Sequence, residues 1–380
     1  MNDLAVVIKD SATRLAEISK KIPTRAVSIS QTRSWMQCKR KWALQRIFPE
    51  DFSQEFFAVG KAVHKGLEDY YGGKPLAMAL EEAEKELKIS ETQDFTNQWD
   101  LVKHMITGYI NFNEKNHDYE IVATELEFEL PLGYPLDELE RMSDEEYKNV
   151  SKAKGVIDFI AVTTRDIVIS EDVVIPKGEI IAGEYKTASR AGNIDYELDN
   201  QAALYLLVLS ELLNMHVRYI VFNTLYKKMP KEPAILKNGD VSAQAIVTTQ
   251  EIYGNALINV YGSIEKAPEK CQALYHKLAG SDSSFFSRQY VYRSQEELNS
   301  ISDTLLTIVP QLNKDYAEIS ADFDTTGKYN FGHCYPNPGR DCSTMCERRD
   351  QCIAMNKREE LPAFNPFAVK LKIAEKESKE

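Results

Sequence analysis

The segment from residue 179 to residue 228 limits the fold more than any other part of the chain. It begins with an apolar run, EIIAGEYKT, whose length and composition are those of a strand. A long apolar helix pattern follows in DNQAALYLLVLSELL, and RYIVFNTLYKK then returns to a strand pattern. A strand, a helix and a second strand in this order favour a mixed α/β sheet with a crossover connection.

Helical patterns dominate the chain up to about residue 115. Residues 3–21 are amphipathic, Ser30 is placed to cap a helix through WMQCKRKWALQRI, and the pattern AVGKAVHKGLEDYY stops at Gly72. From Tyr119 the apolar period becomes two, which predicts a strand through IVATELEFELPL. The acidic stretch DELERMSDEEYKN offers little to bury and predicts a surface excursion before strands resume at GVIDFIAV, DIVIS and DVVIP. The later residues read as mostly helical.

These patterns divide the chain into five expected segments. They are an N-terminal helix (1–27), a helical region (28–118), an α/β core (119–240), a helical C-terminal region (241–360) and a charged tail (361–380). No internal repeat or low-complexity linker separates them.

Composition limits the class of protein. With 380 residues, of which 43% are hydrophobic, the chain can bury at least one large core. A net charge of −12 argues against nucleic acid covering the whole surface but allows a local basic groove. Because the N-terminus lacks a signal-peptide pattern and no apolar stretch is long enough to span a bilayer, we expect a cytoplasmic protein with no membrane partner. In that reducing compartment, clustered cysteines indicate metal rather than disulfides.

Charged residues interrupt two of the apolar strands. Asp158 lies within GVIDFIAV, and Glu184 and Lys186, two positions apart, face the same side of EIIAGEYKT. If the two strands are neighbours, two carboxylates and one ammonium group meet at a sheet end. Carboxylate oxygens suit Mg²⁺ or Mn²⁺, which can polarise a phosphate, and a nearby lysine can orient water. The structural alternative, which the triplet alone favours, is a buried ion-pair network.

Further segments, in a consistent order, make the chain resemble a known family. SISQTRSWMQCKRKWAL, FAVGKAVHKGLEDYY, ATELEFELPL, GVIDFIAV, GEYKTAS and QAALY resemble motifs of the PD-(D/E)XK nuclease superfamily, specifically its RecB-like branch with phage exonuclease-like proteins and CRISPR-adaptation nucleases. The resemblance runs from about Ser28 to Cys352, and FNTLYKKMPKEP and LKNGDVS look most like phage members. It implies a restriction-endonuclease-like fold, with a mixed central sheet flanked by helices and the nuclease core at 119–240.

The resemblance implies a divalent-metal site. Asp158 and Glu184, with His64 from the G-x-x-x-H helix, would bind Mg²⁺ or Mn²⁺, and Lys186 would be the catalytic lysine. Taken alone, His64 fits a core histidine that makes one hydrogen bond. Glu125 is a weaker candidate, because three glutamates alternate along its strand and a solvated face explains them nearly as well.

The helix after the lysine carries a second implied pair. Gln201 and Tyr205 match the Q-x-x-x-Y motif, and residues four apart share one face of a helix. The resemblance implies that their amide and phenol complete the catalytic site by holding the lysine, water or the DNA backbone. The structural alternative is that they mark the rim where this helix meets solvent.

Four cysteines form a separate constellation: Cys38, Cys342, Cys346 and Cys352. Four thiolates can hold zinc or an iron-sulfur cluster, and spacing alone does not decide between them. The resemblance implies a 4Fe-4S cluster, with zinc the lesser alternative, that joins the helical N- and C-terminal segments. The chain departs from many relatives in having three residues rather than two between Cys342 and Cys346, and Cys334 is an additional candidate ligand. Four unrelated free thiols are the structural alternative.

Two basic stretches are candidates for DNA contact. The helix from Arg33 to Arg46 interleaves basic residues with Trp35 and Trp42, whose rings could stack on unpaired bases, and Lys227 and Lys228 lie in a later turn. The same tryptophans, seven residues apart, are equally placed to pack in a core.

Together these inferences favour a metal-dependent deoxyribonuclease. The resemblance implies, more narrowly, an exonuclease of phage recombination or replication that an iron-sulfur cluster stabilises. DNA is the expected partner, with a recombination or replication protein as a second, and an oligomer is compatible with the sequence. A phage-encoded chain would act in the host cytoplasm. The cleavage mode, strand polarity and preference for single or double strands stay open. The alternative is a non-catalytic DNA-binding or assembly factor, or a redox-sensing iron-sulfur protein, on a nuclease fold.

Overall fold

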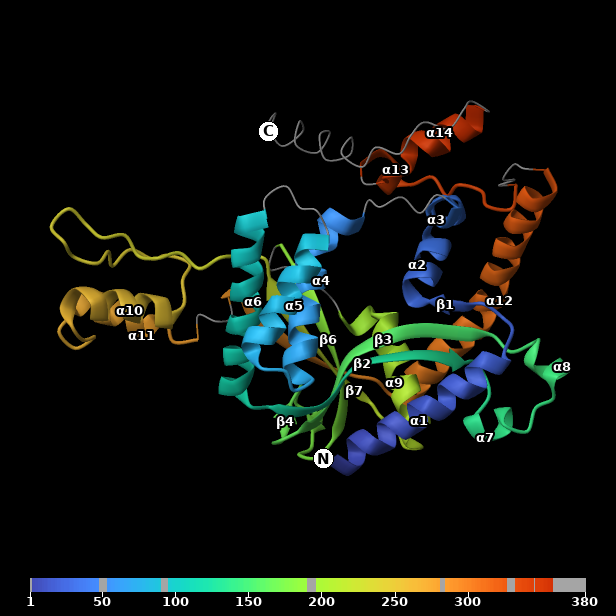
Figure 1. Cartoon of the computed structure of the whole chain (residues 1–380), viewed down its shortest axis with the longest axis horizontal. Coiled ribbons are helices and arrows are strands. Elements are labelled where there is room, and N and C mark those ends of the chain that lie inside the picture. The colour runs from blue at the N-terminus through green and yellow to red at the C-terminus, as the bar shows by residue number, and fades with distance from the viewer. Residues whose placement is uncertain are drawn as a thin grey trace.

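A central sheet with helices on both faces forms the body of the protein (Figure 1). The structure is a computed structural model that describes residues 2–47, 53–89, 95–189, 196–280, 284–326, 332–344 and 346–357. The expected charged tail at 361–380 lies outside the described residues.

The central sheet follows the predicted strand–helix–strand pattern. In the described part of the chain its strands are Ala26–Ser28 (β1), Tyr119–Pro131 (β2), Lys152–Thr163 (β3), Ile180–Ala188 (β6), Tyr219–Tyr226 (β7) and Phe286–Tyr292 (β8). β6 and β7 are parallel and are connected through α9 (Asn200–Leu213), whereas β2, β3 and β6 pair antiparallel, as do β7 and β8. The short strands β4 (Ile167–Val168) and β5 (Val174–Ile175) form a separate ribbon. The sheet is therefore mixed, as expected.

The sheet divides at β3. β2 pairs along one edge of β3 over its whole length. On the other edge, β1 pairs with residues 152–154 and β6 with residues 159–162, so among the described strands none pairs with residues 155–158 on that side. Beyond Gly183, β6 leaves β3 and continues beside β7. Asp158 and Glu184 consequently lie where β3 and β6 separate.

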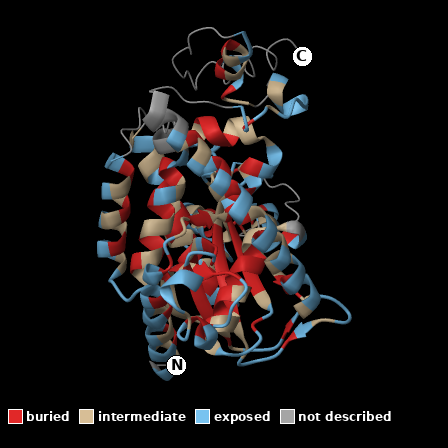
Figure 2. Ribbon diagram, turned by 90° about the vertical axis from the view of Figure 1, so that its right-hand side faces the viewer, coloured by how far each residue is buried: buried red, intermediate tan, exposed pale blue. Residues whose placement is uncertain are grey.

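Helices cover each face of the sheet with its own apolar core. The helices that build the body are Asn2–Lys21 (α1), Ile29–Gln37 (α2), Lys39–Ile47 (α3), Ser53–Tyr71 (α4), Leu76–Ile89 (α5), Phe95–Asn116 (α6) and Gln295–Thr326 (α12). Residues of α1, α2, α9 and α12 cluster on one face, and residues of α4, α5 and α6 cluster on the other. Figure 2 shows the buried strands between these layers and the exposed outer sides of the helices. Burial of both sheet faces explains why apolar residues point to both sides of β6 and β7.

Several local expectations need correction. The helix expected from Ser30 through residue 47 begins after Ser28, whose side chain accepts a hydrogen bond from the Gln31 N–H. It also breaks into α2 and α3 at Cys38, which has an extended backbone. The acidic stretch forms two short helices, Leu136–Leu139 (α7) and Asp144–Tyr147 (α8). It buries leucine and tyrosine side chains, so it is more than a surface excursion.

Two features of the later chain were not anticipated. β8 returns to the central sheet beside β7, although the sequence after residue 240 reads as mostly helical. Between these two strands the chain builds a projection with two helices, Gln250–Tyr261 (α10) and Glu269–Lys277 (α11), which extends away from the body in Figure 1. No helix in the described ranges combines the length and the hydrophobicity that a membrane span requires.

The N- and C-terminal helical regions meet in space. Two short helices near the C-terminus, Arg340–Thr344 (α13) and Arg349–Lys357 (α14), lie beside α2 and α3 (Figure 1). Side chains bridge the two regions: Gln37 donates to Asp341 at 3.0 Å, Gln45 donates to Glu347 at 2.8 Å, and the Arg40 guanidinium donates to the backbone oxygen of Cys334 at 3.1 Å. Polar contacts thus join the segment of α2 and α3 to the region of residues 334–347.

Candidate functional site

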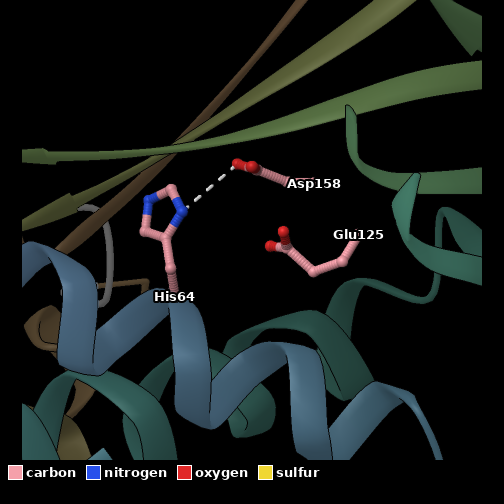
Figure 3. A group of neighbouring side chains, drawn as sticks. All are labelled: His64, Glu125 and Asp158. Atoms are coloured by element: carbon pink, nitrogen blue, oxygen red, sulfur yellow. Dashed lines mark ion pairs between the residues drawn. The ribbon is translucent and has the colours of Figure 1, made fainter. Parts of the chain in front are cut away.

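Asp158 occupies the position where β3 loses its neighbour. Its side chain is almost fully buried, and Oδ2 accepts a hydrogen bond of 2.6 Å from the backbone N–H of Tyr185 on β6. A side-chain oxygen therefore replaces the backbone acceptor that continued pairing would have supplied. The divergence of the two strands leaves room for this carboxylate, and it points toward His64 (Figure 3).

His64 reaches the same place from helix α4. Its Nδ1 lies 3.6 Å from Oδ2 of Asp158, and its ring contacts the edge of the Tyr185 ring. Gly60, one turn earlier, faces Thr187 of β6 so closely that an added Cβ would lie 3.1 Å from its Oγ1. The glycine of the G-x-x-x-H pattern thus permits the close approach of α4 that brings His64 to the strand ends.

Glu125 completes this group. One ligand atom from each of His64, Glu125 and Asp158 lies within 4.8 Å of the other two (Figure 3). Glu125 lies opposite Asp158, because its neighbours Thr124 and Leu126 pair with the residues that flank Asp158. Its φ of 49° is left-handed, which is rare for a residue with a Cβ and is found where surrounding structure holds it.

Glu184, Lys186, Gln201 and Tyr205 form a hydrogen-bonded chain on the α9 side. The Lys186 ammonium donates to Glu184 Oε1 at 2.5 Å and to the Gln201 amide oxygen at 3.0 Å. The Gln201 Nε2 donates to Glu184 Oε1 at 3.2 Å and to the Tyr205 hydroxyl at 2.6 Å. The structure therefore brings the two halves of the Q-x-x-x-Y pattern together with the lysine and the glutamate.

The start of α9 fixes Gln201 in this chain. Asp199 caps the helix, and its side chain accepts a hydrogen bond of 2.7 Å from the backbone N–H of Gln201. An N-cap residue of this type stabilises a helix terminus by about 1 kcal/mol. Asp199 is not among the predicted site residues, although an aspartate directly before an apolar helix is a signal for an N-cap.

The charges in the site are poorly balanced. Burial, followed by the charge of Asp158, raises the pKa of both Glu125 and Glu184 to about 7. Burial opposes protonation of His64, but the carboxylates of Asp158, Glu184 and Glu125 outweigh it and raise its pKa to about 9. A protonated imidazole thus supplies part of the positive charge that the carboxylates require.

This donor set fits a divalent cation. Oε2 of Glu184 is buried without a hydrogen-bond partner among the described residues, which is costly for a carboxylate unless a cation binds it. Two oxygens on opposite sides of Mg²⁺ are about 4 Å apart, so small side-chain movements would bring Glu125 and Asp158 to a shared ion. Binding of such an ion is expected to displace the proton from His64.

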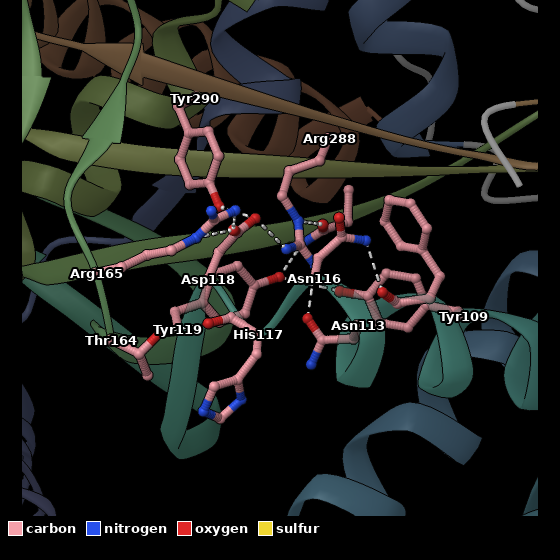
Figure 4. A network of polar contacts seen from close by, with 12 residues as sticks. Tyr109, Asn113, Asn116, His117, Asp118, Tyr119, Thr164, Arg165, Arg288 and Tyr290 are labelled. Carbon is pink, nitrogen blue, oxygen red and sulfur yellow. Dashed lines mark hydrogen bonds and ion pairs between the residues drawn. The ribbon is translucent and has the colours of Figure 1, made fainter. Parts of the chain in front are cut away.

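A buried network supports the sheet on the side away from α9 (Figure 4). Asp118, just before β2, forms ion pairs with Arg165 and with Arg288 of β8, the latter at 2.6 Å. Arg288 also donates to Asn113 of α6 and to Asn223 of β7. The network ties one helix and two strands together, and its geometry positions elements rather than a ligand.

The four predicted cluster cysteines line a single pocket. Cys38, Cys342, Cys346 and Cys352 surround a volume of about 270 Å³ between α3 and the C-terminal helices. The pocket lining does not include Cys334, which is fully buried and whose pKa burial raises to about 12. The helix break at Cys38 also leaves the backbone N–H groups of Lys41 and Asn337 within 3.5 Å of its sulfur.

The tryptophans of the basic helix pair do not form the expected stacking surface, whereas phosphate contact by its exposed Arg33 and Arg46 stays a prediction. Trp35 and Trp42 are 7% and 1% exposed, so their rings belong to the core and the stacking prediction is wrong. Neighbouring lysines are paired with acids: Lys39 lies 3.0 Å from Asp315, and Lys41 lies 3.2 Å from Glu347. These cations join the N-terminal helices to the C-terminal region.

Comparison with known proteins gave one family match, which covers most of the chain. The family model for the PD-(D/E)XK nuclease superfamily matches residues 26–353, which include the strands of the central sheet, the site at the β3–β6 division and all four pocket cysteines. The search of curated proteins found no match. On the extent of the family match, the chain belongs to the PD-(D/E)XK nuclease superfamily.

Proposed function

We propose that the protein is a divalent-metal-dependent DNA nuclease that hydrolyses phosphodiester bonds at the division between β3 and β6. The observation that carries this proposal is the buried cluster of carboxylates, with an unpartnered Glu184 oxygen, beside a held lysine ammonium. Membership of a nuclease superfamily supports the reaction class.

Each residue has a proposed role in this reaction. Asp158, Glu184 and His64 would hold Mg²⁺ or Mn²⁺, and we add Glu125, which lies in the same group. The ion would supply positive charge that polarises the phosphate and activates water. Lys186, fixed between Glu184 and Gln201, would orient the attacking water and offset negative charge on the phosphorus oxygens.

The Q-x-x-x-Y pair would keep Lys186 in position. Gln201 uses its amide oxygen to accept from Lys186 and its amide nitrogen to donate to Tyr205. Burial is the main cause that raises the pKa of the Tyr205 phenol, so the phenol stays neutral in the working pH range. The neutral Tyr205 hydroxyl accepts from Gln201 and so fixes the orientation of the amide. It carries no negative charge that would draw the Lys186 ammonium away from its partners.

We propose exonuclease action on DNA ends, in phage recombination or replication, on the strength of the resemblance to phage exonuclease-like proteins. A labelled linear duplex and a closed circular DNA of the same sequence separate the two cleavage modes. An exonuclease degrades the linear form and leaves the circle intact, whereas nicking of the circle would contradict this part of the proposal.

We also propose an iron-sulfur cluster in the four-cysteine pocket. A single zinc ion would hold its thiolate sulfurs about 3.8 Å apart. In the described part of the chain, however, the group of ligand atoms at such short spacing is His64, Glu125 and Asp158 and includes no cysteine. Sulfurs arranged around a larger pocket, with backbone N–H groups directed at Cys38, favour a multi-iron centre.

The test of the nuclease proposal uses three substitutions. Asp158→Ala and Lys186→Ala should each lower Mg²⁺-dependent cleavage of linear DNA on the order of 1,000-fold. Both variants should still bind DNA, because both substitutions lie within the site and leave the cations on the rest of the surface unchanged. Glu127→Ala is the matched control, since Glu127 is an exposed carboxylate on the same strand as Glu125. It should keep full activity.

The same assay separates the non-catalytic alternative. A wild-type protein that binds DNA but cleaves neither linear nor circular DNA with Mg²⁺ or Mn²⁺ would support a binding or assembly factor. Cleavage that persists in Lys186→Ala would instead remove the lysine from the proposed mechanism.

A further inference from the structure

The projection between β7 and β8 begins at the catalytic end of the sheet. We name residues 227–280 the arm and residues 227–249 the arm loop. Lys186 of β6 pairs in register with Thr224 of β7, and the backbone N–H of Lys227 donates to the oxygen of Ala188 at 2.7 Å. The arm therefore leaves the body a few residues beyond the proposed catalytic lysine, at the end of the neighbouring strand.

The arm has a core of its own. Its apolar cluster is separate from the two cores of the body and consists of Val241, Tyr253, Leu257, Ala267, Cys271 and Leu278. Cys271 lies inside it with its sulfur 3.4 Å from the backbone oxygen of Val241. A unit with its own core can hold a fixed shape while projecting from the body.

The arm loop is an ordered hairpin held against α10. The backbone N–H of Lys231 donates to Val247, and that of Ser242 donates to Ala234, each at 2.8 Å. The hydroxyl of Tyr253 on α10 donates to the Ser242 oxygen at 3.0 Å. At the tip, a turn is closed by the hydrogen bond from Leu236 to Asp240 and has Gly239 in a left-handed conformation. The hairpin therefore presents its side chains in fixed positions.

The side chains of the arm loop form a basic and apolar surface. The loop contains four lysines but only two acidic residues, although the whole chain has a net charge of −12. Lys228, Lys231 and Lys237 are exposed, and none of them takes part in an ion pair in the described part of the chain. At the tip, Ile235 and Leu236 are 56% and 47% exposed beside Lys237.

This combination matches DNA better than an acidic protein. Unpaired lysines neutralise phosphates, and exposed aliphatic side chains next to them can pack against sugars and bases. A strand that reaches Lys186 has the arm loop beside it, because both lie at the same end of the sheet. Leu236 is ten positions beyond Tyr226, so the tip can extend at most about 35 Å, or about ten nucleotides of stacked DNA.

We propose that the arm loop is a DNA-holding surface that contacts the substrate at up to about ten nucleotides from the scissile phosphate. Lys228, Lys231 and Lys237 would contact phosphates, and Ile235 and Leu236 would contact the strand at the tip. This proposal rests on the proposed nuclease function for its substrate, but the contact itself can be measured without cleavage.

The test compares two triple substitutions in the full-length protein. The test variant replaces Lys228, Lys231 and Lys237 with Gln. The matched control replaces Lys266, Lys270 and Lys277 with Gln, which removes the same charge from exposed positions around α11 in the same arm. Binding of a labelled duplex is measured by fluorescence anisotropy in EDTA over a series of salt concentrations.

We expect the test variant to bind DNA on the order of 10- to 100-fold more weakly at physiological salt, with a log–log salt slope smaller by about two to three. The control variant should bind like the wild type. Shortening the duplex below about ten base pairs should reduce wild-type affinity but should have little effect on the test variant. Equal affinity and slope for wild type and test variant would overturn the proposal, as would an equal loss in the control variant.

Cleavage measurements separate this proposal from the nuclease proposal. With Mn²⁺, a small chromogenic phosphodiester, bis(p-nitrophenyl) phosphate, is too short to reach the arm. The test variant should hydrolyse it at the wild-type rate while its kcat/KM on long linear DNA falls. If the wild type hydrolyses neither substrate, the nuclease proposal fails, and the anisotropy result still decides whether the arm loop binds DNA.

Discussion

Glu125 differs in backbone conformation from the two other glutamates that alternate along its strand. Glu125, Glu127 and Glu129 alternate along β2, yet Glu127 is exposed and Glu129 is paired with Lys152 at 3.0 Å. Glu125 alone of the three has a left-handed φ, which costs about 1–2 kcal/mol for a residue with a Cβ. Strain of this kind persists where neighbouring structure enforces it, and it is concentrated at functional sites.

Replacing Glu125 with Gly should separate strain from metal binding. Gly adopts the left-handed conformation freely, so Glu125→Gly should be more stable than Glu127→Gly by about 1–2 kcal/mol in urea unfolding. The same change removes a carboxylate, so Mn²⁺ binding measured by isothermal titration calorimetry should weaken about 10-fold. Glu127→Gly is the control and should bind Mn²⁺ as the wild type does.

Two results would count against this account of Glu125. If Glu125→Gly binds Mn²⁺ with unchanged affinity, Glu125 is not part of the cation site. If the two glycine variants are equally destabilised, the left-handed backbone at position 125 carries no strain.

The sequence predicted the residues that depend on local pattern. The period-two alternation placed Glu184 and Lys186 on one side of a strand, and the helical spacing of Gln201 and Tyr205 placed them on one face; the structure joins these four side chains. The role of Glu125 could not be predicted in this way, because its φ depends on how β2 pairs with β3 opposite Asp158. Likewise, no pattern within the basic helix distinguishes a tryptophan in the core from one on the surface.

At the scale of elements, the division of the sheet at β3 determines where chemistry can occur. In a fully paired strand, a carboxylate side chain would be covered by the packed helix layer on its side of the sheet. Asp158 instead lies where the backbone pairing between β3 and β6 stops. The order strand–helix–strand predicted β6, α9 and β7, because each of these elements is an apolar run of the length typical of its type. β8 was missed because the arm separates it from β7 in the sequence, and strand pairing over such a distance leaves no local signal.

The network around Asp118 gives a prediction for stability against pH. Burial alone would raise the pKa of Asp118, but hydrogen bonds from Arg165 and Arg288 outweigh it and lower the pKa. Folding therefore favours the charged carboxylate. The resulting stabilisation is complete above about pH 4, the ordinary pKa of an aspartate, and is lost as the pH falls through the lower folded-state pKa.

Asp118→Asn should lower the free energy of unfolding at pH 7 by about 3 kcal/mol, because it leaves the buried Arg288 without its carboxylate. Urea unfolding between neutral and acidic pH should also show a shallower loss of stability in the variant than in the wild type. Asp137→Asn is the control, since the pair between Asp137 and Arg14 is exposed and contributes little. Parallel pH profiles for wild type and Asp118→Asn would contradict the role given to this network.

At the scale of the whole molecule, contacts join two regions that are far apart in the sequence, namely α2 and α3 and the C-terminal helical region. Helices α2 and α3 contact the C-terminal region through ion pairs, through the hydrogen bond from Trp35 to Asp315, and around the four-cysteine pocket. The sequence motifs predicted that Cys38 meets the C-terminal cysteines. They could not show that Arg40 and Lys41, beside Cys38, serve this junction, because the partners of these residues lie about 300 positions away in the chain.

Because of its place at this junction, the proposed cluster would contribute to the stability of the whole fold. A centre bound by Cys38 and by three C-terminal cysteines would use its binding free energy to hold α2 and α3 against the C-terminal helices. Cys346→Ala should therefore lower iron content and visible absorption after anaerobic purification, lower the melting temperature by several degrees, and speed proteolytic release of the C-terminal helices.

Cys334→Ala is the matched control, because Cys334 is buried nearby but does not line the pocket. It should keep iron and resist protease as the wild type does. Loss of iron in the control, or wild-type iron content in Cys346→Ala, would show that the pocket cysteines are not the ligands and that polar contacts alone join α2 and α3 to the C-terminal helices.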